Sequence, residues 1–121
     1  MPEMRLIEVT YGSALAIESY GPGFFRVGTH VLRGASLITP WDAGAWGGLD
    51  DLATPLAMVG KIDVLLLGLG RDIAVVPKAF RAALEAQGIG VEPMNTPAAC
   101  RTYNVLLGEG RRIAAALLPV E

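Results

Sequence analysis

Cysteine and histidine, on which most metal sites and much nucleophilic catalysis depend, are almost absent from this sequence. Its 121 residues contain one cysteine, Cys100, and one histidine, His30. A single cysteine excludes an intramolecular disulfide and a cysteine-rich zinc site. A Ser-His-Asp triad would need His30 at its centre, whereas the pattern around His30 indicates an ordinary strand residue. We therefore expect no catalytic residues, no metal and no bound cofactor.

An excess of positive charge is also missing. The chain has 10 Lys and Arg residues against 12 Asp and Glu residues, so its formal net charge is −2. Proteins that bind nucleic acids neutralise phosphates with clustered cations. The sequence therefore predicts no nucleic-acid partner.

No apolar run is long enough to cross a bilayer, although 52% of the residues are hydrophobic. A spanning helix needs about 20 consecutive apolar residues, whereas the best run, residues 62–70, is much shorter and carries Asp63. Residues 1–11 include Glu3, Arg5 and Glu8, so they contain no signal-peptide core. We expect one cytoplasmic domain over residues 1–121, without membrane insertion.

Alternating apolar and polar residues predict several strands in the first part of the chain. These strands are expected at residues 5–10, 14–20, 24–27, 30–33 and 35–39, with turns at 11–13 and 28–29. Gly28-Thr29 is typical of a two-residue hairpin turn, because glycine suits its first position.

The rest of the chain alternates between helical and strand patterns. Residues 62–68 are apolar on both faces after Asp63, which predicts a buried central strand with a parallel neighbour. Helices are expected at residues 49–59, 77–87 and 96–107, and further strands at 90–94 and 111–118, with 73–76 a short strand or a connection. Thr54 and Thr96, each followed by proline, are the predicted helix caps. This order predicts a single α/β domain.

Both tryptophans, Trp41 and Trp46, lie in the glycine-rich segment 40–48, for which we expect a loop. Two interpretations stay open. The indoles could cover the edge of the core, or they could form a contact surface for a partner, because tryptophan is enriched in binding hot spots.

Gly68-Leu69-Gly70 follows the predicted central strand, as in dinucleotide-binding turns. The match fails at the third glycine, where Ile73 stands, and no helix follows directly. The simpler interpretation is a tight turn where only glycine fits; a small anion nest of backbone N–H groups is the alternative. Cys100, in the first turn of the last helix, is interpreted as a small buried hydrophobic residue rather than a nucleophile.

Polar side chains gather on the last helix and just after it. Arg101 and Asn104 share one helical face, and Glu109 is expected to form an ion pair with Arg101, Arg111 or Arg112. These groups either fix a helix–turn–strand corner or line a pocket beside the glycine turn. The candidate pocket residues are Gly68, Gly70, Thr96, Arg101, Tyr103, Asn104, Glu109 and Arg111.

Three stretches together resemble a known family of small uncharacterised proteins. They are the segment 63–70 around Gly68-Leu69-Gly70, the segment 96–106 that begins Thr96-Pro97, and the segment 109–119 that begins Glu109-Gly110. The segments 20–24 and 40–41 fit the same family. It includes the mitochondrial complex I assembly factor three and the mammalian adipogenesis-associated protein of the same domain.

The resemblance implies a mixed central sheet with flanking helices and a β-hairpin extension. It implies no enzymatic activity and a role in assembling respiratory complex I through protein partners. The family's turn usually reads Gly-Thr-Gly, and Leu69 here removes that hydroxyl. The mitochondrial members carry a targeting extension, which we expect this chain to lack.

Two functions follow as hypotheses. The first is a non-catalytic interaction protein, an accessory or assembly factor for a membrane complex, with protein partners and with self-association left open. The alternative is a small-molecule-binding protein or enzyme that uses the polar pocket beside Gly68-Leu69-Gly70.

Overall fold

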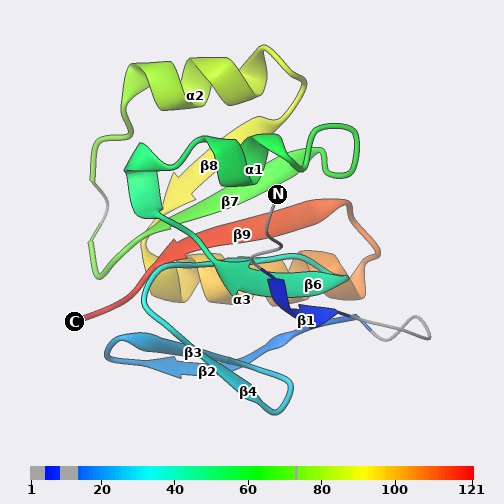
Figure 1. The fold of residues 1–121 in the computed structure, drawn as a ribbon, viewed down its shortest axis with the longest axis vertical. Helices are drawn as coiled ribbons and strands as arrows, with labels where there is room; N and C mark the ends of the chain where they lie inside the picture. Colours follow the sequence, from blue (N-terminus) through cyan, green and yellow to red (C-terminus); the bar gives the residue numbers. More distant parts are fainter. Residues whose placement is uncertain (1–4, 9–13, 73) are drawn as a thin grey trace.

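A six-stranded mixed sheet and a separate three-stranded sheet form the framework of the computed structural model, which describes residues 5–8, 14–72 and 74–121 (Figure 1). The strands are β1 (Arg5–Glu8), β2 (Ile17–Gly21), β3 (Phe24–Val27), β4 (His30–Arg33), β5 (Ser36–Ile38), β6 (Asp42–Ala45), β7 (Val64–Leu69), β8 (Gly90–Met94) and β9 (Ile113–Leu118). The helices are the single 3-10 turn η1 (Gly48–Asp50), α1 (Ala53–Leu56), α2 (Lys78–Glu85) and α3 (Thr96–Gly108). The α/β class is confirmed.

The large sheet has the strand order β1-β6-β5-β9-β7-β8. β7 pairs in parallel with both β8 and β9, whereas β9 pairs with β5, β5 with β6, and β6 with β1 in antiparallel fashion. The small sheet, β2-β3-β4, is a pair of antiparallel hairpins. The mixed central sheet and the hairpin extension implied by the family resemblance are therefore confirmed.

β7 is the buried strand that its unbroken apolar run predicts. Leu65, Leu66 and Leu67 are all at most 1% exposed. Successive side chains of a strand point to opposite faces. Leu65 and Leu67 pack with α2 on one face of the sheet, and Leu66 packs with α3 on the other. Neighbouring strands cover both edges of β7, so this strand is interior in the sheet, as expected.

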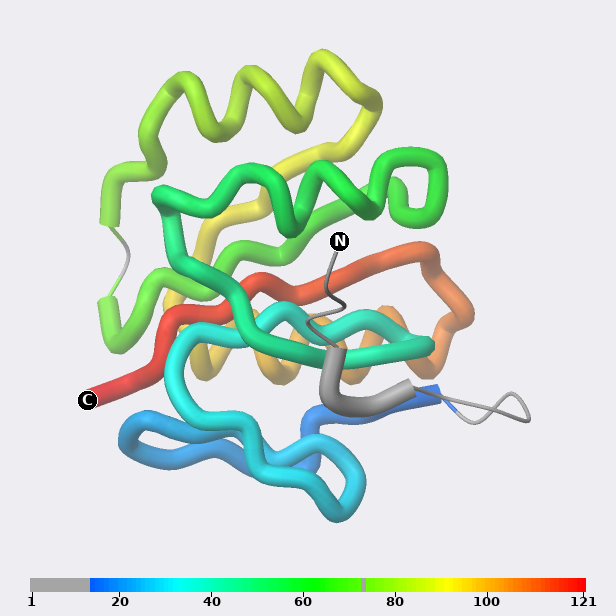
Figure 2. Tube along the Cα trace, viewed as in Figure 1, coloured from blue at the N-terminus to red at the C-terminus, as the bar shows by residue number. Residues whose placement is uncertain are grey.

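Helices pack on both faces of the large sheet, α2 on one and α3 on the other, so two hydrophobic cores form (Figure 2). The core under α2 contains Phe80, Leu84 and Trp46. The core under α3 contains Ala99, Cys100 and Tyr103 of the helix, and on its far side it continues into the small sheet through Phe25 and other apolar residues. α3 is thus buried between two sheets.

Two residues of α3 fasten the small sheet to the helix by hydrogen bonds. The Asn104 amide accepts from the backbone N–H of Ile17 at 2.9 Å and donates to the Ile17 carbonyl at 2.8 Å. The Tyr103 hydroxyl donates to the Leu15 carbonyl at 2.7 Å. β2 is an edge strand, and β3 pairs with it on one side only. The helix side chains bond to the backbone groups at the start of β2 that a strand on the other side would otherwise bond to.

Segment 40–48 is not the loop expected from its glycines. Residues 42–45 form β6, which pairs with β5 from Ser36↔Ala45 to Ile38↔Ala43 and also with β1. Ala43 and Gly44 are buried, because residues of this small size fit below the neighbouring layers. Pro40-Trp41 forms the turn between β5 and β6, which the Thr39 hydroxyl holds by accepting from the N–H groups of Trp41 and Asp42.

Both helix caps predicted from threonine are wrong by one to three residues. Asn95 caps α3 by accepting from the Ala98 N–H at 2.8 Å, while Thr96 is the first helical residue. Before α1, Asp51 accepts from the N–H and hydroxyl of Thr54 and from the Gly47 N–H. Burial raises the pKa of Asp51, but these hydrogen bonds outweigh it and hold the pKa below its ordinary value.

Other boundaries also shift. The helix expected over residues 49–59 is divided into η1 and the short α1, and the strand expected over 14–20 starts at Ile17. Residues 74–76 are a connection rather than a strand, and Ile73 lies outside the described residues. The same is true of residues 9–13, and so of the predicted turn at 11–13.

Gly68 and Gly70, at the end of β7 and just after it, are required for different physical reasons. A Cβ on Gly68 would stand 2.8 Å from Leu117 Cδ2, 2.9 Å from Thr96 Oγ1 and 3.1 Å from Thr96 Cα, so only glycine lets α3 approach β7 this closely. Gly70 has φ +91°, a conformation that other residues rarely adopt. Glycine is required at both positions, but only Gly70 lies in the turn, because the strand continues to Leu69.

We predict that Gly68→Ala lowers the free energy of unfolding by about 1–3 kcal/mol, because overpacking against a helix backbone cannot relax cheaply. Gly108→Ala is the matched control, since a Cβ there meets no atom within 4 Å and the residue is helical. We expect the control to be neutral or slightly stabilising. Urea denaturation of the two variants checks this, and equal stabilities would contradict the proposed steric role.

We predict that Asn104→Asp destabilises the protein by about 1–3 kcal/mol at neutral pH, because a carboxylate cannot donate to the Ile17 carbonyl. The deficit should shrink as the pH falls towards about 4, because the penalty for ionisation raises the pKa of the new carboxyl in the folded protein, and the protonated carboxyl regains a donor. Gln87→Glu makes the same amide-to-acid change at an exposed site and should have little effect. Thermal unfolding of both variants between about pH 4 and pH 7 measures the loss of stability. A loss for Asn104→Asp that does not depend on pH would count against this hydrogen bond.

Candidate functional site

The carboxyl ends of β7, β8 and β9 meet at the start of α3, where sequence reasoning placed one end of the pocket. Thr96 is fully buried there. Its hydroxyl accepts from the Gly70 N–H at 2.8 Å and donates to the Leu118 carbonyl at 2.6 Å, while its own N–H donates to the Gly70 carbonyl at 2.7 Å. One side chain thus joins the ends of β7 and β9 to the first turn of α3.

These contacts use the groups that an anion nest would need. The Gly70 N–H points to Thr96, and the Ala98 N–H in the first turn of α3 points to Asn95. The three candidate residues Gly68, Gly70 and Thr96 are brought together as predicted, but as a hydrogen-bonded junction.

The other candidate residues lie further along α3. Tyr103 and Asn104 face the small sheet and hold it. Arg101, Glu109 and Arg111 are exposed, and the last two follow the end of the helix. A helix of 13 residues is about 20 Å long at 1.5 Å per residue. The structure therefore does not bring Glu109 and Arg111 next to the glycine turn.

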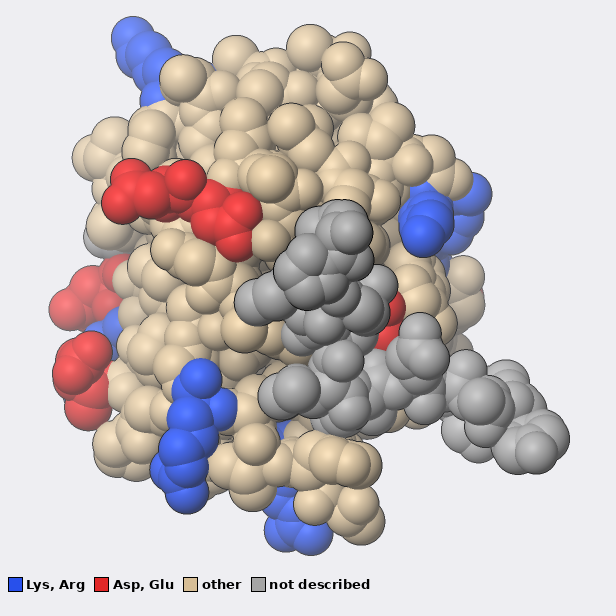
Figure 3. All heavy atoms as spheres, viewed as in Figure 1, with Lys and Arg blue, Asp and Glu red and all other residues tan. Residues whose placement is uncertain are grey.

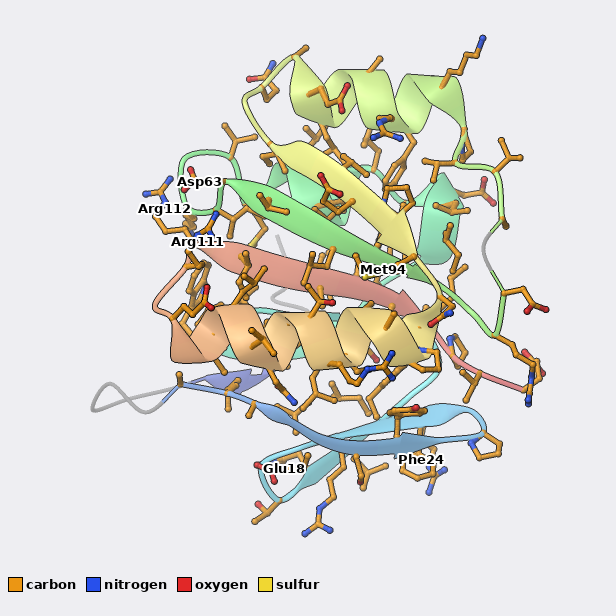
Figure 4. The ribbon with its side chains drawn as sticks, turned by 180° about the vertical axis from the view of Figure 1, so that it is seen from behind. Glu18, Phe24, Asp63, Met94, Arg111 and Arg112 are labelled. Carbon is orange, nitrogen blue, oxygen red and sulfur yellow. The ribbon has the colours of Figure 1, made fainter. Side chains whose placement is uncertain are left out.

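The ion pair expected for Glu109 is wrong. Within the described residues, the carboxylate of Glu109, which directly follows α3, forms no ion pair. Arg112 pairs instead with Asp63 at 3.2 Å and also donates to the Gly60 carbonyl. Figure 4 shows Asp63, Arg111 and Arg112 close to one another at the start of β7 and β9.

The side chains of Cys100 and Tyr103 are buried in the core under α3. Cys100 is 4% exposed, and burial raises its pKa to about 12 against the smaller, opposing effect of the Arg101 charge. The thiol is therefore protonated at neutral pH and is a poor nucleophile. Burial, followed by the charge of Asp42, also raises the pKa of Tyr103. The interpretation of Cys100 as a core residue agrees with this placement.

The two tryptophans have different environments. Trp46 is 4% exposed, its indole N–H donates to the Asp51 carbonyl at 2.9 Å, and its ring lies 6.3 Å from that of Phe80 at 55°. Of the two open interpretations, covering the core is the one that fits Trp46, because its side chain is part of the core under α2. Trp41, in the turn between β5 and β6, is half-buried and keeps part of its indole on the surface.

A surface hollow of about 430 Å³ is lined by Trp41 and Lys61. Lys61 lies in the connection between α1 and β7 and is exposed. An indole beside an ammonium group can receive an aromatic or acidic side chain. Sequence reasoning missed Lys61, because only the fold brings it beside Trp41.

Neither a metal site nor a membrane-spanning helix is found in the described part of the chain. No group of three or more His, Cys, Asp or Glu residues among residues 5–8, 14–72 and 74–121 could hold a metal ion. In these same ranges, no helix is long and apolar enough to cross a membrane, and the 13 residues of α3 fall well short.

Comparison with known proteins agrees with the family resemblance. An uncharacterized protein of Rhodobacter capsulatus is 52% identical over 113 residues, which are 93% of this chain and 91% of that protein. The NADH dehydrogenase (ubiquinone) 1 alpha subcomplex assembly factor 3 of Danio rerio is 32% identical over 123 residues, covering 96% of this chain and 71% of that protein.

A solved structure shares the fold. The crystal structure of a Bartonella henselae protein, described as an outer membrane protein, matches with a TM-score of 0.82 and 33% identity, covering 93% of this chain and 100% of that one. The pattern of the family described as "Protein of unknown function (DUF498/DUF598)" matches residues 17–118. With most of its length matched in this way, and with relatives at 52% and 32% identity, this chain belongs to the DUF498/DUF598 family.

Proposed function

We propose that this chain is a non-catalytic interaction protein that assists the assembly of a membrane complex such as respiratory complex I. The observation that carries the proposal is the similarity to the zebrafish complex I assembly factor, which extends over 96% of this chain. Because the similarity spans nearly the whole chain, it supports a shared fold and not only a shared motif.

The use of the polar groups supports a binding role over a catalytic one. The hydroxyls of Thr96 and Tyr103 and the amide of Asn104 each form hydrogen bonds that hold the elements of the fold together. A group that is buried in a satisfied structural bond is costly to expose. The residues with the most suitable chemistry for a pocket are thus committed to stability.

Trp41 and Lys61 are the proposed contact residues. A half-buried indole is anchored by the core while its exposed part can contact a partner, and tryptophan is enriched in interface hot spots. The hollow that the two residues line has a volume of about 430 Å³, which is large enough to receive a side chain of a partner protein.

We predict that loss of this chain from its native host lowers the amount of assembled complex I, measured on native gels with NADH–quinone activity as the second readout. Wild-type protein should restore the complex, whereas Trp41→Ala should restore it poorly. Truncation of a central aromatic anchor commonly weakens binding by about 2 kcal/mol or more.

Tyr20→Ala is the matched control, because Tyr20 is a partly exposed aromatic residue on the small sheet, and we expect it to complement fully. Circular dichroism verifies that each variant folds, and Lys61→Glu tests the same hollow without removing an aromatic ring. Unchanged complex I in the deletion strain would falsify the assembly role. Full complementation by both hollow variants would place the contact elsewhere.

A further inference from the structure

The small sheet has an outer face that the core does not use. Phe25, Val27 and Leu32 are buried against α3. Because successive side chains of a strand point to opposite faces, the alternate positions of β3 and β4 point away from the helix. These positions are Phe24, Arg26, Val31 and Arg33.

The four side chains form an alternating pattern. Phe24 lies opposite Arg33 and Arg26 lies opposite Val31 in the register of the two strands. Each arginine therefore has an apolar residue as its cross-strand neighbour and another two positions along its own strand. Val31 is 47% exposed, and both arginines are exposed. We call these four residues the hairpin face.

Phe24 is held on this face by the neighbouring strand. A Cβ on Gly21, its partner in β2, would stand 2.5 Å from Phe24 Cε2, so the aromatic ring lies directly over this glycine. Phe24 belongs to neither core cluster. A large aromatic ring is thus kept on the outside of the sheet, packed on one side and open on the other.

The hairpin face is positively charged. Within the described residues, neither Arg26 nor Arg33 forms an ion pair. Glu18 is the one acidic residue of the small sheet. It lies at the irregularity of β2 between the partners of Val27 and Arg26, so it is near Arg26 and far from Phe24, which Figure 4 shows towards the opposite end of that sheet. In Figure 3, Lys and Arg side chains project over the same sheet, at the bottom of the view.

We infer that the hairpin face binds a protein partner that presents carboxylates around an apolar or aromatic centre. Two guanidinium groups can each take a carboxylate in bidentate fashion, and Phe24 and Val31 supply the apolar contact between them. Arginine and aromatic residues are the types enriched at protein interfaces. This surface goes beyond the proposed role of Trp41, since it lies on the other sheet.

The observations favour a protein over an anionic membrane. Attraction to an anionic leaflet is worth about 1 kcal/mol for each basic residue near its surface, so two arginines give weak adsorption. Their fixed spacing on a paired sheet, with an apolar residue between them, is instead suited to a partner with a matching arrangement.

The test uses the ¹⁵N-labelled full chain and a random copolymer of glutamate and tyrosine as the probe. We expect amide shift changes concentrated in β2, β3 and β4, weaker changes with polyglutamate, and binding that weakens as salt is raised. Arg26→Glu combined with Arg33→Glu should lower the affinity about tenfold or more, since two attractive charge pairs are replaced by like-charge repulsion.

The control is Lys78→Glu combined with Arg111→Glu, which changes the net charge equally at exposed residues away from the small sheet. We expect it to bind the copolymer like the wild type, and the dispersion of the amide spectrum verifies folding. Equal loss in both double variants would overturn the inference, because net charge alone would then explain binding. So would the absence of binding, or stronger shifts of the same amides with phosphatidylglycerol vesicles than with the copolymer.

Discussion

The burial of α3 between two sheets is the constraint on which the rest of the structure depends. Its apolar side chains belong to one core that runs from Leu66 and Ala115 of the large sheet to Phe25 of the small one. On β9 the small side chain of Ala115 faces the helix, so the helix can approach the sheet closely there. Close approach then requires glycine at position 68 and allows the Thr96 hydroxyl to reach both neighbouring strand ends.

This constraint also decides which polar residues remain available for function. A helix with solvent on one side could direct Tyr103, Asn104 and Cys100 into a pocket. Because α3 is covered on both sides, Tyr103 and Asn104 instead satisfy backbone groups of Leu15 and Ile17 that lack a strand partner. The buried thiol keeps a raised pKa for the same reason. The polarity that suggested a site is therefore the means by which the second sheet is attached.

The features that could be predicted from the sequence are those that depend on residues close together in the chain. The apolar run of β7, the Gly28-Thr29 hairpin and the exposed Arg81–Glu85 pair on α2 were all predictable, because each depends on neighbours within a few residues. The junctions at α3 were not, since Asn104 and its partner Ile17 are 87 residues apart. β6 was missed because Ala43 and Gly44 indicate a loop by composition, and only pairing with β5 and β1 makes them a strand.

Sequence also could not show how the β8 edge of the large sheet is protected. β8 is an edge strand, and such strands can pair with another chain through free backbone groups. Here the Arg81 guanidinium donates to the Val91 carbonyl at 3.1 Å, and Pro93 has no N–H to offer. A partner that added a strand at β8 would have to displace Arg81 and would lack a donor at Pro93. Recognition through side chains on the faces of the molecule, as at Trp41 and on the hairpin face, is therefore favoured over extension of this edge.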